Sequence, residues 1–497
     1  MWNPDSSAAE NTYYSVAEVR AIDRAAIEGQ GIPGYVLMTR AAEAALSIMR
    51  EQYSDRQTWM VLCGGGNNGG DGYVLARLAR AAGIGVTTCW LSDPAGLTGD
   101  AGKAYADFIA EGMVAKPFEA SELPAEGLIV DAMLGSGLER DVAGSYRDAV
   151  EWANRSLVPT VALDIPTGLN GDSGRVMGVA VRADLTVTFV GLKAGLILSD
   201  GPDCCGIVVL ADLDIPSVCR EAKPGLLRTL PDTEFRAMLR PRAENTHKGI
   251  FGHAVIVGGA PGMSGAVRIA GEAALRAGAG MVTLLTSPEH AASLNQGRPE
   301  LMVRGIESAD DAVPWLAKAD VVAIGPGLGL DDRARSLLAA SLESAKPLII
   351  DADALTLLAE SGAVPAEAIL TPHPGEAARL LGSSSAEVQA DRPGALRQLA
   401  ERYRATVILK GSGTLISSMQ GIPWVCDEGN PGMASAGMGD ALTGVVASLR
   451  GQGLEQEAAA VVGTRVHARA GDRAAQQGER GLLASDLIDA IRPLVNP

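Results

Sequence analysis

The chain has 497 residues, a length that accommodates about two to four domains of ordinary size. Hydrophobic residues make up 47% of the chain, which excludes a globally disordered protein. The formal net charge is −17, which argues against nucleic-acid binding through a general basic surface. Any phosphate-bearing ligand must therefore be held locally, by backbone amides, helix N-termini and a few cationic side chains.

The cysteines and the apolar runs indicate the compartment. None of the six cysteines forms a C-x-x-C pair or a zinc-spaced cluster with histidine, so a reducing cytoplasm is the simplest setting. The N-terminus shows no secretory signal, and no apolar run approaches the ~20 residues needed to cross a bilayer. We therefore expect a cytoplasmic protein without membrane or nucleic-acid partners.

Alternating strands and helices fill the first half. Ser15 and Glu18 form a predicted capping box that opens a helix, which Gly29 and Gly31 end. Further helices are predicted over residues 36–50 and 73–82, and strands over 58–63, 86–91, 128–131, 160–164 and 185–189. This alternation predicts a mostly parallel sheet with helices on both faces.

The pattern breaks between Ile215 and Gly249, where four prolines punctuate a charged, irregular stretch, and we place the domain boundary near residue 225. A second alternation follows, with strands predicted over 253–259, 281–286, 319–325, 347–353 and 405–410 and a long helical segment after Asp440. The fold class is therefore α/β in both halves.

The strongest motif of the first half is C-G-G-G-N-N-G-G-D-G, from Cys63 to Gly72, which follows a strand and opens a helix. Its glycines would let the backbone approach a ligand closely, and its free amides favour an anion. It is not a P-loop, because G-K-[ST] is missing. The alternative is an ordinary turn in which Gly, Asn and Asp act as turn formers.

Two further strands end in polar loops. Asp131 opens D-A-M-L-G-S-G, and Asp164 lies in L-D-I-P-T-G-L. Ligands of open α/β sheets bind at the carboxyl ends of the strands, so these loops should face one crevice; helix capping is the alternative for either aspartate. Asn68, Asp131 and Thr167 offer hard oxygen ligands with a single carboxylate, which suits a monovalent cation better than zinc. Asp164 is the best candidate for a general acid or base.

These three motifs, in this order and spacing, closely resemble the NAD(P)H-hydrate epimerase family over about residues 15–220. The resemblance implies a Rossmann-like, three-layer fold and interconversion of the R and S hydrates of NADH and NADPH. It also implies potassium (K+) at Asn68, Asp131 and Thr167. The substrate-binding residues that it implies are Asn67, Asn68, Gly69, Gly70, Asp71, Gly135, Ser136, Gly137, Leu138, Glu139, Arg140, Asp141 and Asp164.

Four glycine- or proline-rich motifs of the second half are candidates for ligand binding. G-M-S-G-A (262–266) and I-G-P-G-L-G (324–329) each follow a strand and favour a backbone cradle for a ligand, although a tight packing turn is the alternative. In T-P-H-P-G-E (371–376) two prolines fix the backbone around His373, which we interpret as a substrate contact rather than a structural histidine. Amides after Lys410 would grip a nucleotide phosphate, and Asp440 is placed to take a proton from a hydroxyl unless it is only a helix N-cap.

Together these motifs resemble the ADP-dependent NAD(P)H-hydrate dehydratases, which are ribokinase-like, over about residues 226–497. The resemblance implies ADP and Mg2+. It places substrate at Ala266, Gly327, His373 and Asp440, and ADP at Lys410, Gly411, Ser412, Gly413, Thr414 and Gly439. One departure is visible: relatives usually read G-G-T-G-D where this chain has Met438 in place of threonine. Since the backbone amides remain, we expect activity to survive.

The resulting hypothesis is a bifunctional cofactor-repair enzyme. An epimerase domain over residues 1–225 would precede a dehydratase domain over residues 226–497, with Asp164 and Asp440 as catalytic residues. Its ligands would be NADH and NADPH hydrates and ADP, and the chain would form a homo-oligomer. A ribokinase-like kinase of a small alcohol and a non-catalytic nucleotide-binding scaffold are the alternatives.

Overall fold

The computed structural model describes residues 11–120, 126–361, 367–417 and 421–497. The chain divides into two compact units, Met1–Arg228 and Thr229–Pro497, with the division close to the residue 225 expected from the proline-rich stretch. Within the described ranges, no helix is both long enough and apolar enough to span a bilayer.

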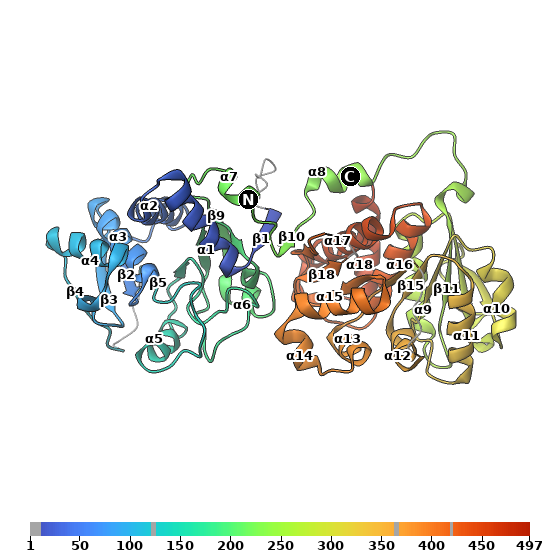
Figure 1. The fold of residues 1–497 in the computed structure, drawn as a ribbon. Helices are drawn as coiled ribbons and strands as arrows, with labels where there is room; N and C mark the ends of the chain where they lie inside the picture. Colours follow the sequence, from blue (N-terminus) through green and yellow to red (C-terminus); the bar gives the residue numbers. More distant parts are fainter. Residues whose placement is uncertain (1–10, 121–125, 362–366, 418–420) are drawn as a thin grey trace. The chain divides into compact units, whose positions relative to one another are not determined.

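The first unit is built on a parallel sheet of seven strands in the order β4-β3-β2-β5-β6-β7-β9 (Figure 1). The strands are β2 Thr58–Cys63, β3 Gly85–Trp90, β4 Ala115–Pro117, β5 Leu128–Ala132, β6 Thr160–Leu163, β7 Leu185–Phe189 and β9 Ile207–Ala211. All strands predicted for this half are present. Strands β4 and β9, which lie at the two edges of the sheet, were not predicted from the sequence.

Helices cover both faces of this sheet, as the three-layer prediction requires. α2 Gly34–Gln52, α3 Asn67–Ala81 and α4 Gly99–Ala110 pack together on one face, and α5 Ser145–Ala153 packs on the other (Figure 1). Both faces of the sheet are apolar, as strand β2 illustrates, because successive side chains point to opposite faces of a strand. Trp59 and Val61 join the core under α3, whereas Leu62 joins the core under α5.

The first helix of this unit, α1, begins with a capping box. Ser15 Oγ accepts the Glu18 N–H at 3.2 Å, and a Glu18 carboxylate oxygen accepts the Ser15 N–H at 2.9 Å, which confirms the predicted capping box. Helix α1 Val16–Arg24 continues into a π-helical turn, Ala25–Gly29. The remaining short elements are β1 Thr12–Tyr14, β8 Leu192–Lys193, α6 Gly201–Cys205, α7 Val218–Glu221 and β10 Leu227–Arg228.

Helix α3 begins at Asn67, six residues before the predicted start at Tyr73. Three glycines of the motif are therefore helical and closely packed, and the substrate contacts expected of Gly69 and Gly70 stay predictions. A Cβ on Gly69 would lie 2.1 Å from the Gly64 carbonyl oxygen, and one on Gly72 would lie 2.6 Å from Ala132 Cβ. Only glycine lets the first turns of α3 approach the neighbouring strands this closely.

Among its described residues, the second unit contains nine strands in the order β13-β12-β11-β14-β15-β16-β17-β18-β19, parallel up to β17 and antiparallel from there. The strands are β11 His253–Val257, β12 Met281–Thr286, β13 Met302–Gly305, β14 Val321–Ile324, β15 Leu348–Ile350, β16 Ala368–Leu370, β17 Thr406–Leu409, β18 Thr414–Ser417 and β19 Trp424–Cys426. All strands predicted for this half are present, and the α/β fold class is confirmed.

Two groups of helices accompany this sheet. One group packs around α16, and its members are α9 Ser264–Arg276, α16 Met438–Gly451, α17 Gln456–Ala474 and α18 Ala484–Leu494. The others are α8 Asp232–Met238, α10 Ala309–Leu316, α11 Asp332–Glu343, α12 Ala352–Ser361, α13 Pro374–Leu381, α14 Ser385–Ala390 and α15 Arg392–Tyr403. The long helical segment predicted after Asp440 is thus two helices, α16 and α17, separated at Gly453, whose φ of +97° ends the first.

Candidate functional sites

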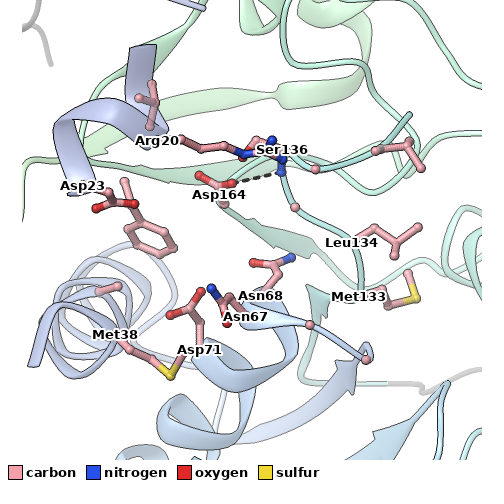
Figure 2. A pocket seen from close by; sticks show the side chains of 18 of the residues that line it. Arg20, Asp23, Met38, Asn67, Asn68, Asp71, Met133, Leu134, Ser136 and Asp164 are labelled. Carbon is pink, nitrogen blue, oxygen red and sulfur yellow. Dashed lines mark hydrogen bonds between the residues drawn. The ribbon is translucent and has the colours of Figure 1, made fainter. Parts of the chain in front are cut away.

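A cavity of about 1200 Å³ lies beside the carboxyl ends of the first unit's central strands (Figure 2). It brings the three predicted motifs together, because Asn67, Asn68, Asp71, Gly135, Ser136, Gly137, Leu138, Glu139, Arg140, Asp141 and Asp164 all line it. Gly69 and Gly70 are not among the lining residues, since they pack inside α3. Helix α1 adds Arg20 and Asp23, which the sequence analysis did not select.

Asp164 is held rigidly at this cavity. Its backbone is left-handed, with φ +68°, and one carboxylate oxygen accepts the Ser136 N–H at 3.2 Å. The other oxygen accepts a hydrogen bond from Lys193 Nζ, which is fully buried and also donates to Thr188 Oγ1 at 2.9 Å. Burial alone would raise the pKa of Asp164, but the Lys193 ammonium and the hydrogen bonds bring it below its usual value. Asp164 is therefore a fixed carboxylate.

Two other carboxyl groups at the cavity have pKa values that are shifted upward, opposite to the shift of Asp164. Burial raises the pKa of Asp71 well above its usual range, and the charges of Asp164 and Asp23 raise it further. Burial also raises the pKa of Asp23 to about 6. Figure 2 shows Asp23, Asp71 and Asp164 around the same space. The site thus combines a carboxyl group whose pKa is lowered with two whose pKa values are raised, the combination that general acid–base chemistry uses.

Lys193 and Asp23 are two functional candidates of the first unit that sequence reasoning missed. Lys193 interrupts the apolar stretch V-G-L-K-A-G-L, residues 190–196, and a lone charged residue in such a stretch is a usable signal of a buried ion pair. Asp23 gave no such signal, because on an amphipathic helix an aspartate is typical of the solvated face.

The predicted cation ligands lie on neighbouring loops. Thr167 Oγ1 donates to Asp131 Oδ1 at 2.7 Å and accepts the Leu134 N–H at 2.8 Å, so Asp131 organises the loop rather than capping a helix. Asp131 is fully buried and, within the part of the chain that the structure describes, has no ion-pair partner. Burial raises the pKa of its carboxyl to about 6. Both side-chain amide atoms of Asn68 are buried without a hydrogen-bond partner among the described residues.

The second unit contains a buried ion-pair cluster at the ends of β15 and β17. Lys410 Nζ lies 2.8 Å from Asp351 Oδ1 and 3.7 Å from Glu376 Oε2, while Thr443 Oγ1 donates to Asp351 Oδ2 at 2.7 Å. Burial would lower the pKa of Lys410, but the surrounding carboxylates raise it. Burial would likewise raise the pKa of Asp351, and Lys410 brings it below its usual value. The cluster is therefore a fixed set of charges.

Asp440 adjoins this cluster from the first turn of α16. The N-cap of that helix is Gly437, at φ +89°, so the interpretation of Asp440 as an N-cap is wrong. A Cβ on Gly439 would lie 3.3 Å from Lys410 Nζ, which brings the turn and the cluster together. Burial, and then the charge of Asp351, raise the pKa of Asp440 to about 7. A carboxyl group with this pKa is suited to act as a general base near neutral pH.

Met438, the departure from the usual threonine, is the first residue of α16. Its side chain is buried in the core of the second unit, and its carbonyl oxygen lies 2.9 Å from His467 Nε2. Packing therefore accounts for methionine at this position, and the helix turn that carries Gly439 and Asp440 is intact.

His373 and the glycine cradles complete the predicted set. His373 caps α13, with Nδ1 accepting the Gly375 N–H at 3.0 Å, and more than half of its side chain is exposed. A Cβ on Gly327 would lie 3.3 Å from Ala266 Cβ, so these two predicted substrate residues lie side by side. His373 thus has a structural role and a largely exposed side chain, and its substrate contact stays a prediction.

Comparison with known proteins decides the family. Residues 254–493 match the family model described as NAD(P)H-hydrate dehydratase, and residues 34–195 match that described as YjeF-related protein N-terminus. The chain is 45% identical over 485 residues to the bifunctional NAD(P)H-hydrate repair enzyme Nnr of Coxiella burnetii, an alignment that covers 97% of this chain and 99% of that protein. The chain belongs to this family. The prediction of a bifunctional NAD(P)H-hydrate repair enzyme is confirmed.

Two further proteins are similar to this chain, one of them a repair enzyme of the same family. The repair enzyme Nnr of Escherichia coli is 41% identical, over 98% of this chain and 94% of that protein. A solved structure of a hypothetic protein from Streptococcus mutans superposes with a TM-score of 0.51 at 28% identity, covering 54% of this chain and 98% of that one. Members of the bifunctional repair family therefore align with both halves of this chain.

Proposed function

We propose that the cavity of the first unit epimerises the R and S hydrates of NADH and NADPH. The observation that carries this proposal is the Asp164 carboxylate, held by Lys193, at the same cavity as the carboxyl of Asp71, whose pKa is raised. Epimerisation requires the hydroxyl to leave one face of the reduced ring and return to the other. A protonated carboxyl donates to the departing oxygen, and a carboxylate accepts the proton of the returning water.

The second unit, in the same proposal, dehydrates the S hydrate with ADP. Asp440 takes the proton of the ring hydroxyl as that oxygen attacks the β-phosphate, and the amides around Gly439 stabilise the developing charge. Phosphate then leaves with the C–O electron pair, the neighbouring ring carbon loses a proton to solvent, and the electron pair of that C–H bond re-forms the ring double bond. NAD(P)H, AMP and phosphate are released. The raised pKa of Asp440, about 7, supports its role as the base.

Magnesium enters this proposal together with ADP. Mg2+ usually keeps several waters and binds through phosphate oxygens and one or two carboxylates. Within the described residues, no group of three or more His, Cys, Asp or Glu side chains is arranged to hold a metal ion. An ion that arrives with ADP would be held mainly by the phosphates and by one or two carboxylates of the protein, and its chemistry would be to neutralise phosphate charge.

Potassium is our proposal for the group formed by Asn68, Asp131 and Thr167. A buried carboxylate without a cationic partner and a buried amide oxygen without a donor both fit a weakly held monovalent cation. The potassium ion would have a structural role, because it would fix the loops that line the cavity. Homo-oligomeric assembly and a cytoplasmic location stay predictions.

The Asn68→Ala variant tests the potassium site. Loss of one oxygen ligand should raise the KCl concentration for half-maximal epimerase activity by about tenfold or more. The matched control is Asn67→Ala, because Asn67 is exposed; its KCl requirement should equal that of the unaltered protein. Equal KCl curves for Asn68→Ala and the unaltered protein would remove Asn68 from the ligand set.

The proposed function as a whole is tested by supplying a mixture of R and S NADH hydrates with ADP, Mg2+ and K+, and following absorbance of the reduced nicotinamide. Full recovery of NADH is the expected result. Recovery of the S share alone would contradict the epimerase proposal. No recovery with either ADP or ATP would contradict the dehydratase proposal, and a stable phosphorylated product would favour a small-alcohol kinase.

A further inference from the structure

Arg392, the first residue of α15, lies buried beneath the loop between β17 and β18. Only 3% of the residue is exposed. Its guanidinium donates to the carbonyl oxygens of Ser412, of Leu409 at 3.3 Å and of Lys410 at 3.4 Å. Desolvation lowers its pKa to about 10, so the side chain stays cationic at neutral pH. One buried cation thus binds three carbonyls of the loop that carries residues 410–414.

This arrangement determines where the loop amides point. In a trans peptide the C=O and the following N–H point in opposite directions, and the described chain contains no cis peptide bond. Because the carbonyls of Lys410 and Ser412 point at Arg392, the amides of Gly411 and Gly413 point away from it. Neither amide has a hydrogen-bond partner among the described residues.

The two glycines allow this geometry. Gly411 has φ +139° and Gly413 has φ +62°, both in the region that favours glycine. A Cβ on Gly411 would lie only 3.0 Å from Arg392 Nη2, so the loop backbone rests directly on the guanidinium. The loop is therefore shaped against Arg392 and presents its amides on the opposite side.

The charge of Arg392 is also uncompensated. Across the residues that the structure covers, Arg392 forms no ion pair with a carboxylate, and its Nε has no partner. A buried cation without a counter-charge is costly. The neighbouring cation, Lys410, is already paired with Asp351. An anion bound to the amides of Gly411 and Gly413 would supply the missing counter-charge across a single peptide layer.

We propose that Arg392 is the positioning residue for the phosphate end of ADP. It holds the loop with two amides turned outward and places its positive charge behind the phosphates they bind. This inference rests on the proposed role of residues 410–414 in binding ADP. Charge-assisted hydrogen bonds and the geometry they fix account for about ten- to a hundredfold in affinity.

Nucleotide binding by the Arg392→Met and Arg392→Lys variants tests the proposal. In Arg392→Met the Kd for ADP should rise about ten- to a hundredfold, while the Kd for adenosine, which has no phosphate, stays within about twofold. The KM for ADP should rise with the Kd, and kcat should change less. Arg392→Lys keeps the charge but cannot bridge three carbonyls, so its Kd for ADP should lie between that of the unaltered protein and that of Arg392→Met. The exposed Arg397→Met on the same helix is the matched control.

An equal loss of ADP and adenosine affinity in Arg392→Met would overturn the proposal, since it would indicate collapse of the whole site. An unchanged Kd for ADP would overturn it as well. If Arg392→Met does not fold, with the midpoint of thermal unfolding as the criterion, the Lys variant decides by the same ADP-to-adenosine comparison. Binding is measured without turnover, so an unaltered chain that binds ADP but shows no dehydratase activity would contradict the proposed function and leave the role of Arg392 standing.

Discussion

The Asp440→Asn variant should lose about 10²- to 10⁴-fold in dehydratase kcat while its epimerase rate stays that of the unaltered chain. Asparagine keeps the size and the helix turn but cannot accept the proton of the ring hydroxyl. Absorbance of the NADH formed from S hydrate and ADP measures the first rate. Because the epimerase half belongs to the same chain, its rate on R hydrate reports the amount of active protein in each preparation.

The pH profile gives Asp440 a second, independent signature. Its pKa is raised to about 7, so the carboxylate form predominates above pH 7 and is lost as the pH falls. Dehydratase kcat should therefore fall about tenfold per pH unit below about pH 6 and level off above about pH 8. Asp440→Asn should lack this limb. Asp332→Asn, an exposed first-turn aspartate of α11, is the matched control and should keep it. A profile common to all three proteins would exclude Asp440 as the base.

The predicted bounds of individual helices and strands agree with the observed bounds to different degrees. Strands β2 and β12 were predicted with their observed bounds, since each is an apolar run between turn signals. The start of α3 was missed because Asn and Gly favour turns locally, whereas close packing of Gly69 and Gly72 against the sheet overrides that preference. Tertiary packing, which no local pattern contains, decided this element.

The candidate sites divide in the same way. Motif residues that follow strands, such as Asp164 and Lys410, were found because parallel strands all end at one edge of the sheet. Lys193 and Arg392 were missed because each contacts a loop that is distant in the sequence. The residues next to them in the sequence do not indicate which loop that is. Their discovery required the three-dimensional arrangement.

The Lys193→Met variant should lower epimerase kcat at pH 7 by about a hundredfold or more and shift the activity to higher pH. Lys193 is the cation that holds the pKa of Asp164 below its usual value against the opposing effect of burial. Without it, burial raises that pKa, so Asp164 is protonated at neutral pH and becomes a carboxylate only as the pH increases. Removing one partner of a buried pair also destabilises the first unit by about 3–5 kcal/mol while Asp164 stays ionised.

Comparison with Asp164→Asn separates positioning from catalysis. If Lys193 acts by keeping Asp164 ionised, Lys193→Met regains activity as the pH rises above neutral, whereas Asp164→Asn stays inactive at every pH. Lys116→Met removes an exposed lysine of the same unit and should change neither rate nor profile. The dehydratase rate of each variant confirms that the second unit is intact. A Lys193→Met enzyme whose first unit is folded but which is slow at all pH values would show that Lys193 does not act by keeping Asp164 ionised.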